Sequence, residues 1–144
     1  YKQAQALLSK FYHTELWYIK KAGKEWVIKK NLIEILLHIE LENIDFVESR
    51  LLSFKRTYFS YLRNIKQERV ITYLSLVESY YKNPEIVTST KYKNTVENSF
   101  KWIEKQREDI FVMSFYAWLK SKMENKNLFI TTLNLVENLK EIIK

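Results

Sequence analysis

The chain has 144 residues, and 24 basic against 17 acidic side chains give it a net charge of +7. It contains no cysteine, which excludes disulfide scaffolds, cysteine-ligated zinc sites and thiol catalysis. It has one glycine, Gly23, and one proline, Pro84, where average usage would give about ten and about seven. This scarcity argues against sheet-rich folds, which use both residues in tight turns.

Length and composition predict one domain that covers residues 1–144. Because the chain opens on Tyr1 rather than Met and shows no signal-peptide pattern, we expect it to be a piece of a longer protein. No apolar run approaches the ~18 residues that a membrane span requires. The lack of cysteine fits a reducing compartment. We therefore expect a cytoplasmic protein without membrane partners.

Apolar residues recur at helical spacing almost throughout the chain, and this predicts about seven helices. The first runs from about Lys2 to Lys21 and ends near Gly23, where glycine can adopt the left-handed cap conformation. The second covers about 24–41 and is apolar around much of its girth, which is typical of a helix between neighbours. The third begins at a capping box of Asp45 and Glu48 and continues to about residue 62.

The fourth helix covers about 66–81 and ends before Pro84, because proline disfavours helix in the residue that precedes it. The remaining helices are expected at about 90–105, 108–123 and from 129 to the end. Corners of two to seven residues place neighbouring helices antiparallel. The sequence therefore predicts an all-α fold of about seven antiparallel helices, stacked as helix hairpins.

Two corners of the chain resemble each other. The segments 41–47 and 123–129 each have an apolar residue, a Glu-Asn pair, a capping residue and two apolar residues. The segment 81–83 marks a third corner near their midpoint. A helix-hairpin repeat of about 41 residues, within the range of helical solenoids, explains all three corners. The alternative is that two antiparallel helix pairs share this spacing by chance.

The segment 39–48 resembles the centre of a tetratricopeptide repeat, although Glu42 stands where that family usually has Gly and Val47 where it usually has Ala. The segments 36–45 and 115–125 are similar to the C-terminal region of a family of uncharacterised bacterial helical-repeat proteins. This similarity covers about residues 20–130. It implies a tetratricopeptide-like α-α superhelix with degenerate repeats, and it implies neither an activity nor active-site residues.

Few residues of this chain offer catalytic chemistry. A single glycine cannot build the loops that cradle phosphates. His38 has Glu34 one turn before it and Glu42 one turn after it, a stripe that could hold a metal ion. Without a second histidine at ligand spacing, we favour a partly exposed His38 with ordinary helix-surface contacts. The acidic pair 108–109 suits a helix start better than acid–base catalysis. We expect no enzyme, no metal and no cofactor.

The first functional hypothesis is a non-enzymatic scaffold that binds a protein or peptide on the concave face of stacked hairpins. The polar stripe Lys30, Glu34 and His38, spaced i, i+4 and i+8 on the second helix, is the predicted contact. Three hairpins use only the second to seventh helices, so the outer face of the first is predicted to allow self-association. An enzyme with a polar site buried between helices is a further hypothesis, which no cluster in the sequence supports.

The other hypothesis is nucleic-acid binding, because aromatic side chains stack on bases while basic ones meet phosphates. The predicted patch consists of Trp17, Lys20, Lys21, Lys24, Lys55, Arg56 and Arg63. The alternative interpretation, which we favour, places Trp17 and Trp26 in the core at the first corner and treats the basic residues as a solvated surface.

Overall fold

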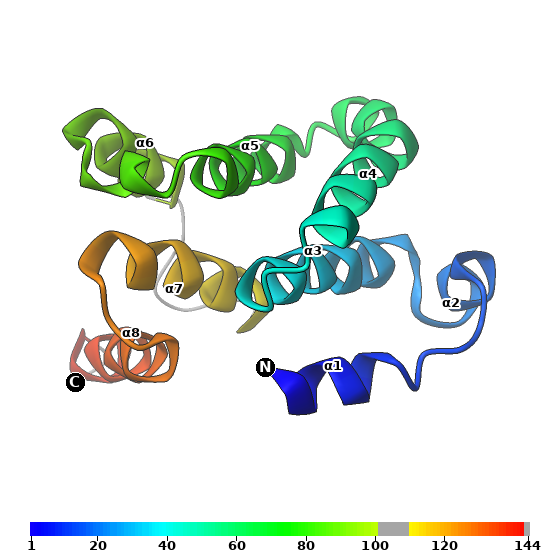
Figure 1. Cartoon of the computed structure of the whole chain (residues 1–144), viewed down its shortest axis with the longest axis horizontal. Helices are drawn as coiled ribbons and strands as arrows, with labels where there is room; N and C mark the ends of the chain where they lie inside the picture. The colour runs from blue at the N-terminus through cyan, green and yellow to red at the C-terminus, as the bar shows by residue number, and fades with distance from the viewer. Residues whose placement is uncertain (101–109, 143–144) are drawn as a thin grey trace. The chain divides into compact units, whose positions relative to one another are not determined.

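The structure is a computed structural model that describes residues 1–100 and 110–142. Within these residues the chain forms eight α-helices and one short 3₁₀ helix, and no strand (Figure 1). The all-α prediction is confirmed, whereas the predicted number of about seven helices is one too few. The chain divides into two compact units, Tyr1–Leu74 and Ser75–Lys144. The single-domain assignment stays a prediction.

The first unit contains α1 (Lys2–Leu8), α2 (Glu15–Ala22), α3 (Lys24–Glu40) and α4 (Ile44–Asn64). Helix α5 (Glu68–Lys82) crosses the boundary between the units. The second unit continues with the 3₁₀ helix η1 (Pro84–Thr88), α6 (Thr90–Phe100), α7 (Ile110–Glu124) and α8 (Leu128–Ile142). The predicted helix boundaries at 105 and 108, and the acidic pair 108–109, lie outside the described residues. None of the helices within the described part of the chain is long and apolar enough to cross a membrane.

The additional helix arises because the predicted first helix is interrupted between Ser9 and Thr14. The Ser9 hydroxyl donates to the Ala6 carbonyl at 2.8 Å, a local bond that competes with helix continuation. Thr14 has an extended backbone, and its hydroxyl oxygen accepts from the Trp17 amide at 3.3 Å. Thr14 therefore caps α2. Apolar spacing continues across the interruption, so periodicity alone predicts one helix here.

Gly23 forms the whole corner between α2 and α3, with φ of 89° and ψ of 158°. The positive φ is as the sequence predicts, but the ψ value places Gly23 outside the left-handed helical region. It lies in a region that is essentially restricted to glycine. The Gly23 amide still donates to the Ile19 carbonyl at 3.0 Å, so the last turn of α2 is closed.

Helix α4 begins at Ile44, after Asn43 at the N-cap position, so the predicted capping box of Asp45 and Glu48 is wrong. The chain leaves α3 by a tight corner that places the next helix start two residues earlier than the capping pattern suggests. Asp45 instead lies in the first turn of α4, where its negative charge interacts favourably with the helix dipole.

Three helices end in the same corner, with a non-glycine residue at positive φ: Glu42 (56°), Lys66 (57°) and Asn125 (50°). In each corner the following amide donates to a carbonyl five residues earlier, as in the Schellman motif. The Glu-Asn pair that two of these corners share does not occupy the same position in both. In the corner after α3 the positive φ falls on the Glu of the pair, Glu42, and in the corner after α7 it falls on the Asn, Asn125. The repeat of about 41 residues stays a prediction.

These corners give a stability prediction. We expect Lys66→Gly to raise the free energy of unfolding by about 0.5–1 kcal/mol, because glycine adopts positive φ without the steric cost that lysine incurs. Asn125→Gly should increase the stability by a smaller amount, since asparagine tolerates a positive φ better than lysine does. The control Arg56→Gly, in the interior of α4, should lose about 1 kcal/mol. Urea unfolding measures all three, and a loss of stability in Lys66→Gly would contradict the assigned backbone.

Helix α3 is the centre of the first unit and packs against α1, α2 and α4. This agrees with its apolar circumference. Seven of its residues are buried: Val27, Ile28, Leu32, Ile35, Leu36, Leu37 and His38. Helix α4 contributes one apolar face to this core, formed by Val47, Leu51, Phe54, Tyr58 and Leu62. By contrast, α1 has no buried residue.

In the second unit α7 packs against η1, α6 and α8. Trp118 of α7 is 2% exposed, and its ring meets that of Tyr80 edge-on at a centroid distance of 5.4 Å. The Tyr92 hydroxyl of α6 donates to the Leu76 carbonyl at 2.9 Å, and burial raises the pKa of Tyr92 to about 12. These contacts connect α5, α6 and α7 around one apolar core.

Candidate functional site

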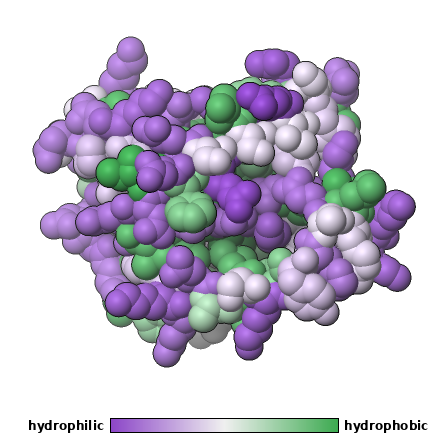
Figure 2. Space-filling model, turned by 45° about the vertical axis from the view of Figure 1, so that its right-hand side comes forward, coloured by the Kyte–Doolittle hydropathy of each residue, from purple (hydrophilic) through white to green (hydrophobic). Residues whose placement is uncertain are grey.

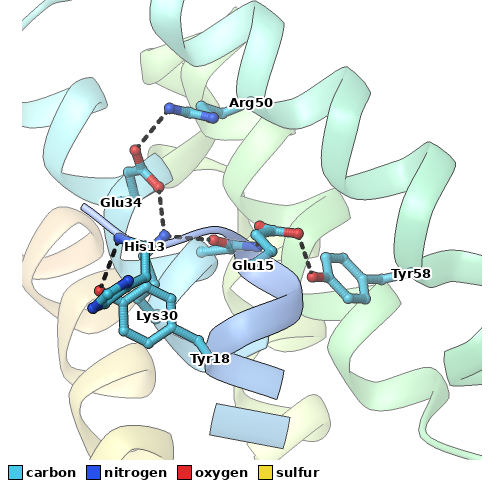
Figure 3. A network of polar contacts seen from close by, with 8 residues as sticks. His13, Glu15, Tyr18, Lys30, Glu34, Arg50 and Tyr58 are labelled. Carbon is cyan, nitrogen blue, oxygen red and sulfur yellow. Dashed lines mark hydrogen bonds and ion pairs between the residues drawn. The ribbon is translucent and has the colours of Figure 1, made fainter. Parts of the chain in front are cut away.

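Glu15, the first residue of α2, connects this helix to both α3 and α4. One carboxylate oxygen accepts from Asn31 Nδ2 at 2.6 Å, and the other accepts from the Tyr58 hydroxyl at 2.8 Å. Figure 3 shows Glu15 and Tyr58 facing each other across this bond. Tyr58 is 1% exposed. Burial, together with the bond to Glu15, raises the pKa of Tyr58 far above its ordinary value, so the phenol keeps its proton and donates.

A second group of polar contacts continues along α3. Lys30 Nζ donates to Asn31 Oδ1 at 3.0 Å and lies 3.3 Å from Glu34 Oε2. The other oxygen of Glu34 lies 3.1 Å from a guanidinium nitrogen of Arg50 on α4 (Figure 3). Because Asn31 contacts both groups, they form one polar network that joins α2, α3 and α4. Its members are Glu15, Lys30, Asn31, Glu34, Arg50 and Tyr58.

A cavity of about 20 Å³ lies beside the polar network, between residues of α2, α3 and α4. A volume of this size holds a water molecule. Sites for small molecules usually measure about 300–1,000 Å³. Each carboxylate oxygen of Glu15 and Glu34 also has a donor or cationic partner within the network. The arrangement is therefore suited to holding three helices together, and it leaves no room for a substrate.

Sequence reasoning did not find this network as a whole, because the contacts of Glu15 and the contact of Glu34 with Arg50 join residues that are far apart in the chain. The structure does bring Lys30 and Glu34 of the predicted stripe together, as an ion pair. Their side chains are only 18% and 17% exposed, so they present little free surface to a partner.

His38, the third residue of the stripe, is 8% exposed, so the expectation that it is partly exposed on the helix surface is wrong. The corner after α3 folds the start of α4 over it. Its ring stacks on Phe46 at 4.9 Å, and its Nδ1 lies 3.2 Å from Asn43 Nδ2. Burial lowers the pKa of His38, and Arg50 lowers it further, while Glu34 acts in the opposite direction. The shift favours the neutral imidazole.

We expect acidification to destabilise the first unit through His38. Its pKa lies below the ordinary value of 6.5, so between these values the unfolded chain binds a proton that the folded chain does not. Stability is fully present above the unfolded pKa and falls as the pH drops through it. Urea unfolding at about pH 7.5 and about pH 5.5 brackets this window. The drop in the free energy of unfolding between these two pH values should be smaller in His38→Gln than in the wild type. An equal drop in the two proteins would contradict this role of His38.

A smaller polar cluster repeats the tyrosine–carboxylate arrangement in the second unit. The Tyr116 hydroxyl of α7 donates to Glu97 Oε2 of α6 at 2.6 Å. Burial and this bond raise the pKa of Tyr116 to about 12. Lys120 lies 3.5 Å from the other oxygen of Glu97 and 3.2 Å from Glu124. In both units, a phenol thus donates to a carboxylate of another helix. Over the described ranges, no group of three or more histidine or acidic side chains is placed to hold a metal ion.

The predicted nucleic-acid patch is only partly available. Lys24 Nζ lies 3.9 Å from the centre of the Tyr61 ring, and the Arg63 guanidinium lies 5.7 Å from that of Phe59. These basic groups contact aromatic rings of α4. The other members of the patch are Trp17, Lys20 and Lys21 on α2, which are exposed, and Lys55 and Arg56 on α4, of which Arg56 is exposed.

An apolar surface is exposed in the segment between α1 and α2 and in the first turn of α2. Phe11, Tyr12, Leu16 and Trp17 are 39%, 82%, 62% and 39% exposed. We name these four residues the N-terminal aromatic surface. The favoured interpretation of Trp17 as a core residue is therefore wrong. Figure 2 turns the α2 side of Figure 1 toward the viewer and shows hydrophobic residues at the surface among hydrophilic ones.

Ring contacts order this surface. The His13 ring stacks on Trp17 at 3.9 Å and lies 4.3 Å from Tyr12. Phe11 and Trp17 each meet the buried ring of Tyr18 edge-on, at 5.7 Å and 5.0 Å. The His13 amide faces the Tyr18 hydroxyl at 3.5 Å. The rings of Phe11 and Trp17 thus pack on the buried ring of Tyr18.

No protein-family model, curated protein or solved structure matches this chain. The resemblance to bacterial tetratricopeptide-like proteins therefore stays a prediction.

Proposed function

We propose that this chain is a non-enzymatic helical scaffold that binds a partner protein through the N-terminal aromatic surface. The observation that carries the proposal is the exposure of four large apolar side chains within residues 11–17. Apolar patches that stay exposed on a folded chain commonly mark interaction sites. Tyrosine, tryptophan and phenylalanine are also the side chains that are enriched at such sites.

The order of this surface supports a binding role. The Thr14 cap fixes the start of α2, and Glu15 connects that start to α3 and α4. The rings of Phe11 and Trp17 pack on that of Tyr18. A preordered surface loses less conformational entropy when a partner binds, so more of the contact energy appears as affinity.

The predicted stacked-hairpin, tetratricopeptide-like architecture belongs to the same proposal. It is supported by the packing of α3 on α4 and of α7 on α8, each pair joined by a short corner.

Nucleic acid is the second candidate partner. Trp17, Lys20 and Lys21 lie within one turn of α2, so an exposed ring and two basic groups share a face. The engagement of Lys24 and Arg63 with aromatic rings of α4 weakens the wider patch. Leu16 and Tyr12, which are the most exposed members of the surface, suit a protein better than a phosphate backbone.

We expect Leu16→Ser to reduce capture of the cellular partner by immobilised chain at least tenfold, because apolar anchors at the centre of an interface contribute most of its affinity. The matched control is Leu52→Ser, since Leu52 of α4 is 59% exposed against 62% for Leu16. Capture is measured by quantitative mass spectrometry of proteins retained on each variant. Equal retention on both variants would contradict the proposal.

A further inference from the structure

We infer that the occupant of the N-terminal aromatic surface is an acidic amphipathic segment of the partner, in which Asp or Glu flanks large apolar residues. This inference rests on the proposed function and specifies the chemistry of the partner. It starts from charge. Residues 1–24 contain five lysines and one acidic residue, a net +4 out of the +7 of the whole chain.

The one carboxylate in this segment, that of Glu15, is already engaged within the first unit. Both oxygens of Glu15 accept hydrogen bonds inside the first unit, from Asn31 and from Tyr58. The exposed charges of this segment that have no partner within the described residues are therefore positive.

The lysines border the apolar residues directly. On α2, Lys20 follows Leu16 by four residues and Trp17 by three, and Lys21 follows Trp17 by four. Side chains at these spacings are neighbours on a helix. Lys10 directly precedes Phe11 in the chain.

These border lysines are exposed, and across the described residues Lys10, Lys20 and Lys21 form no ion pair. An apolar centre with a polar, charged rim is the usual anatomy of an interface. A partner that complements these lysines therefore carries carboxylates around its apolar residues.

The same surface suits the other occupants to different degrees. A second copy would bring the same lysines against each other, and like charges across an interface are repulsive. Self-association through this face, one of the expectations from the sequence, is therefore the weaker alternative. Nucleic acid would satisfy the lysines but not the exposed Leu16. An anionic membrane would satisfy both, and its Leu16-dependent binding is therefore measured beside that of the peptides.

The test is selection of a displayed random 16-residue peptide library on the wild-type chain, with counter-selection on Leu16→Ser. We expect the enriched peptides to combine Leu, Phe or Trp with a net negative charge. Affinity of a purified selected peptide should fall about tenfold on the double variant Lys20→Glu/Lys21→Glu. The control Lys91→Glu/Lys93→Glu changes the net charge equally through exposed lysines of α6, and it should leave the affinity within about twofold.

Several results would overturn the inference. They are enriched peptides without excess acid, no enrichment that depends on Leu16, or an equal loss of affinity in both charge-reversed variants. Tighter Leu16-dependent binding of oligothymidine, of phosphatidylserine vesicles or of a second copy of the chain would overturn it as well. If Leu16→Ser abolishes capture of the cellular partner but Lys20→Glu/Lys21→Glu does not, only the inference fails. If Leu16→Ser has no effect on that capture, the proposed function fails.

Discussion

Trp118→Ala is expected to lower the free energy of unfolding by about 3–5 kcal/mol. Trp118 is 2% exposed, and its ring packs edge-on against Tyr80 while Lys122 Nζ lies 5.4 Å from the ring centre. The substitution removes these contacts and leaves a cavity between α7 and the helices around it. Because the core is closely packed, the neighbouring side chains can fill this cavity only in part.

The matched control for this substitution is Trp17→Ala. It removes the same side chain from a site that is 39% exposed, so we expect a loss of about 1 kcal/mol or less. Urea unfolding followed by circular dichroism measures both variants without relying on the tryptophan signal. Similar losses in the two variants would show that the assigned core of the second unit is wrong.

Glu15→Ala is expected to lower the free energy of unfolding by about 1–3 kcal/mol. For Tyr58→Phe we expect a smaller loss, of about 0.5–1.5 kcal/mol. The two substitutions break the same 2.8 Å hydrogen bond but leave different groups behind. Removal of Glu15 leaves the buried Tyr58 hydroxyl without its acceptor. Removal of the hydroxyl leaves Glu15, which is exposed to water and keeps its bond from Asn31.

Glu15→Gln is the control for charge, since the amide oxygen can still accept from Tyr58 and the loss should fall below that of Glu15→Ala. Hydrogen exchange of the α2 amides should also become faster in Glu15→Ala than in the wild type, because the connection to α3 and α4 is lost. A larger stability loss in Tyr58→Phe than in Glu15→Ala would contradict the assigned network.

The helical class was predictable because it depends on local signals. One glycine, one proline and continuous helical spacing leave few alternatives, and Gly23 and Pro84 mark real corners. The interruption before α2 was missed although a signal was present: Thr14 followed by Glu15 is a typical helix start. Apolar spacing that continued across the gap concealed it. The Asp45 cap was misplaced because the preceding corner, with positive φ at Glu42, has no glycine to reveal it.

The site was less predictable because its geometry depends on contacts between helices. The bond between Glu15 and Tyr58 joins residues 43 apart in the chain, and no local pattern encodes it. His38 is buried because Phe46 folds over it from the next helix. The N-terminal aromatic surface did have a signal, since residues 11–18 contain four aromatic residues and a histidine. The number of aromatic residues in a segment does not reveal whether their rings face outward, and a place in the core is the simpler prediction for such rings.

The most direct measurement is site-specific photocrosslinking in cells that express the chain. A photoreactive benzoylphenylalanine replaces Tyr12 in one variant and Phe129 of α8 in another, at sites that are 82% and 67% exposed. We expect a crosslinked product of discrete mass from position 12, lost when Leu16→Ser is added, and little product from position 129. No product at position 12, or an equal yield from both positions, would contradict a binding role for the N-terminal aromatic surface.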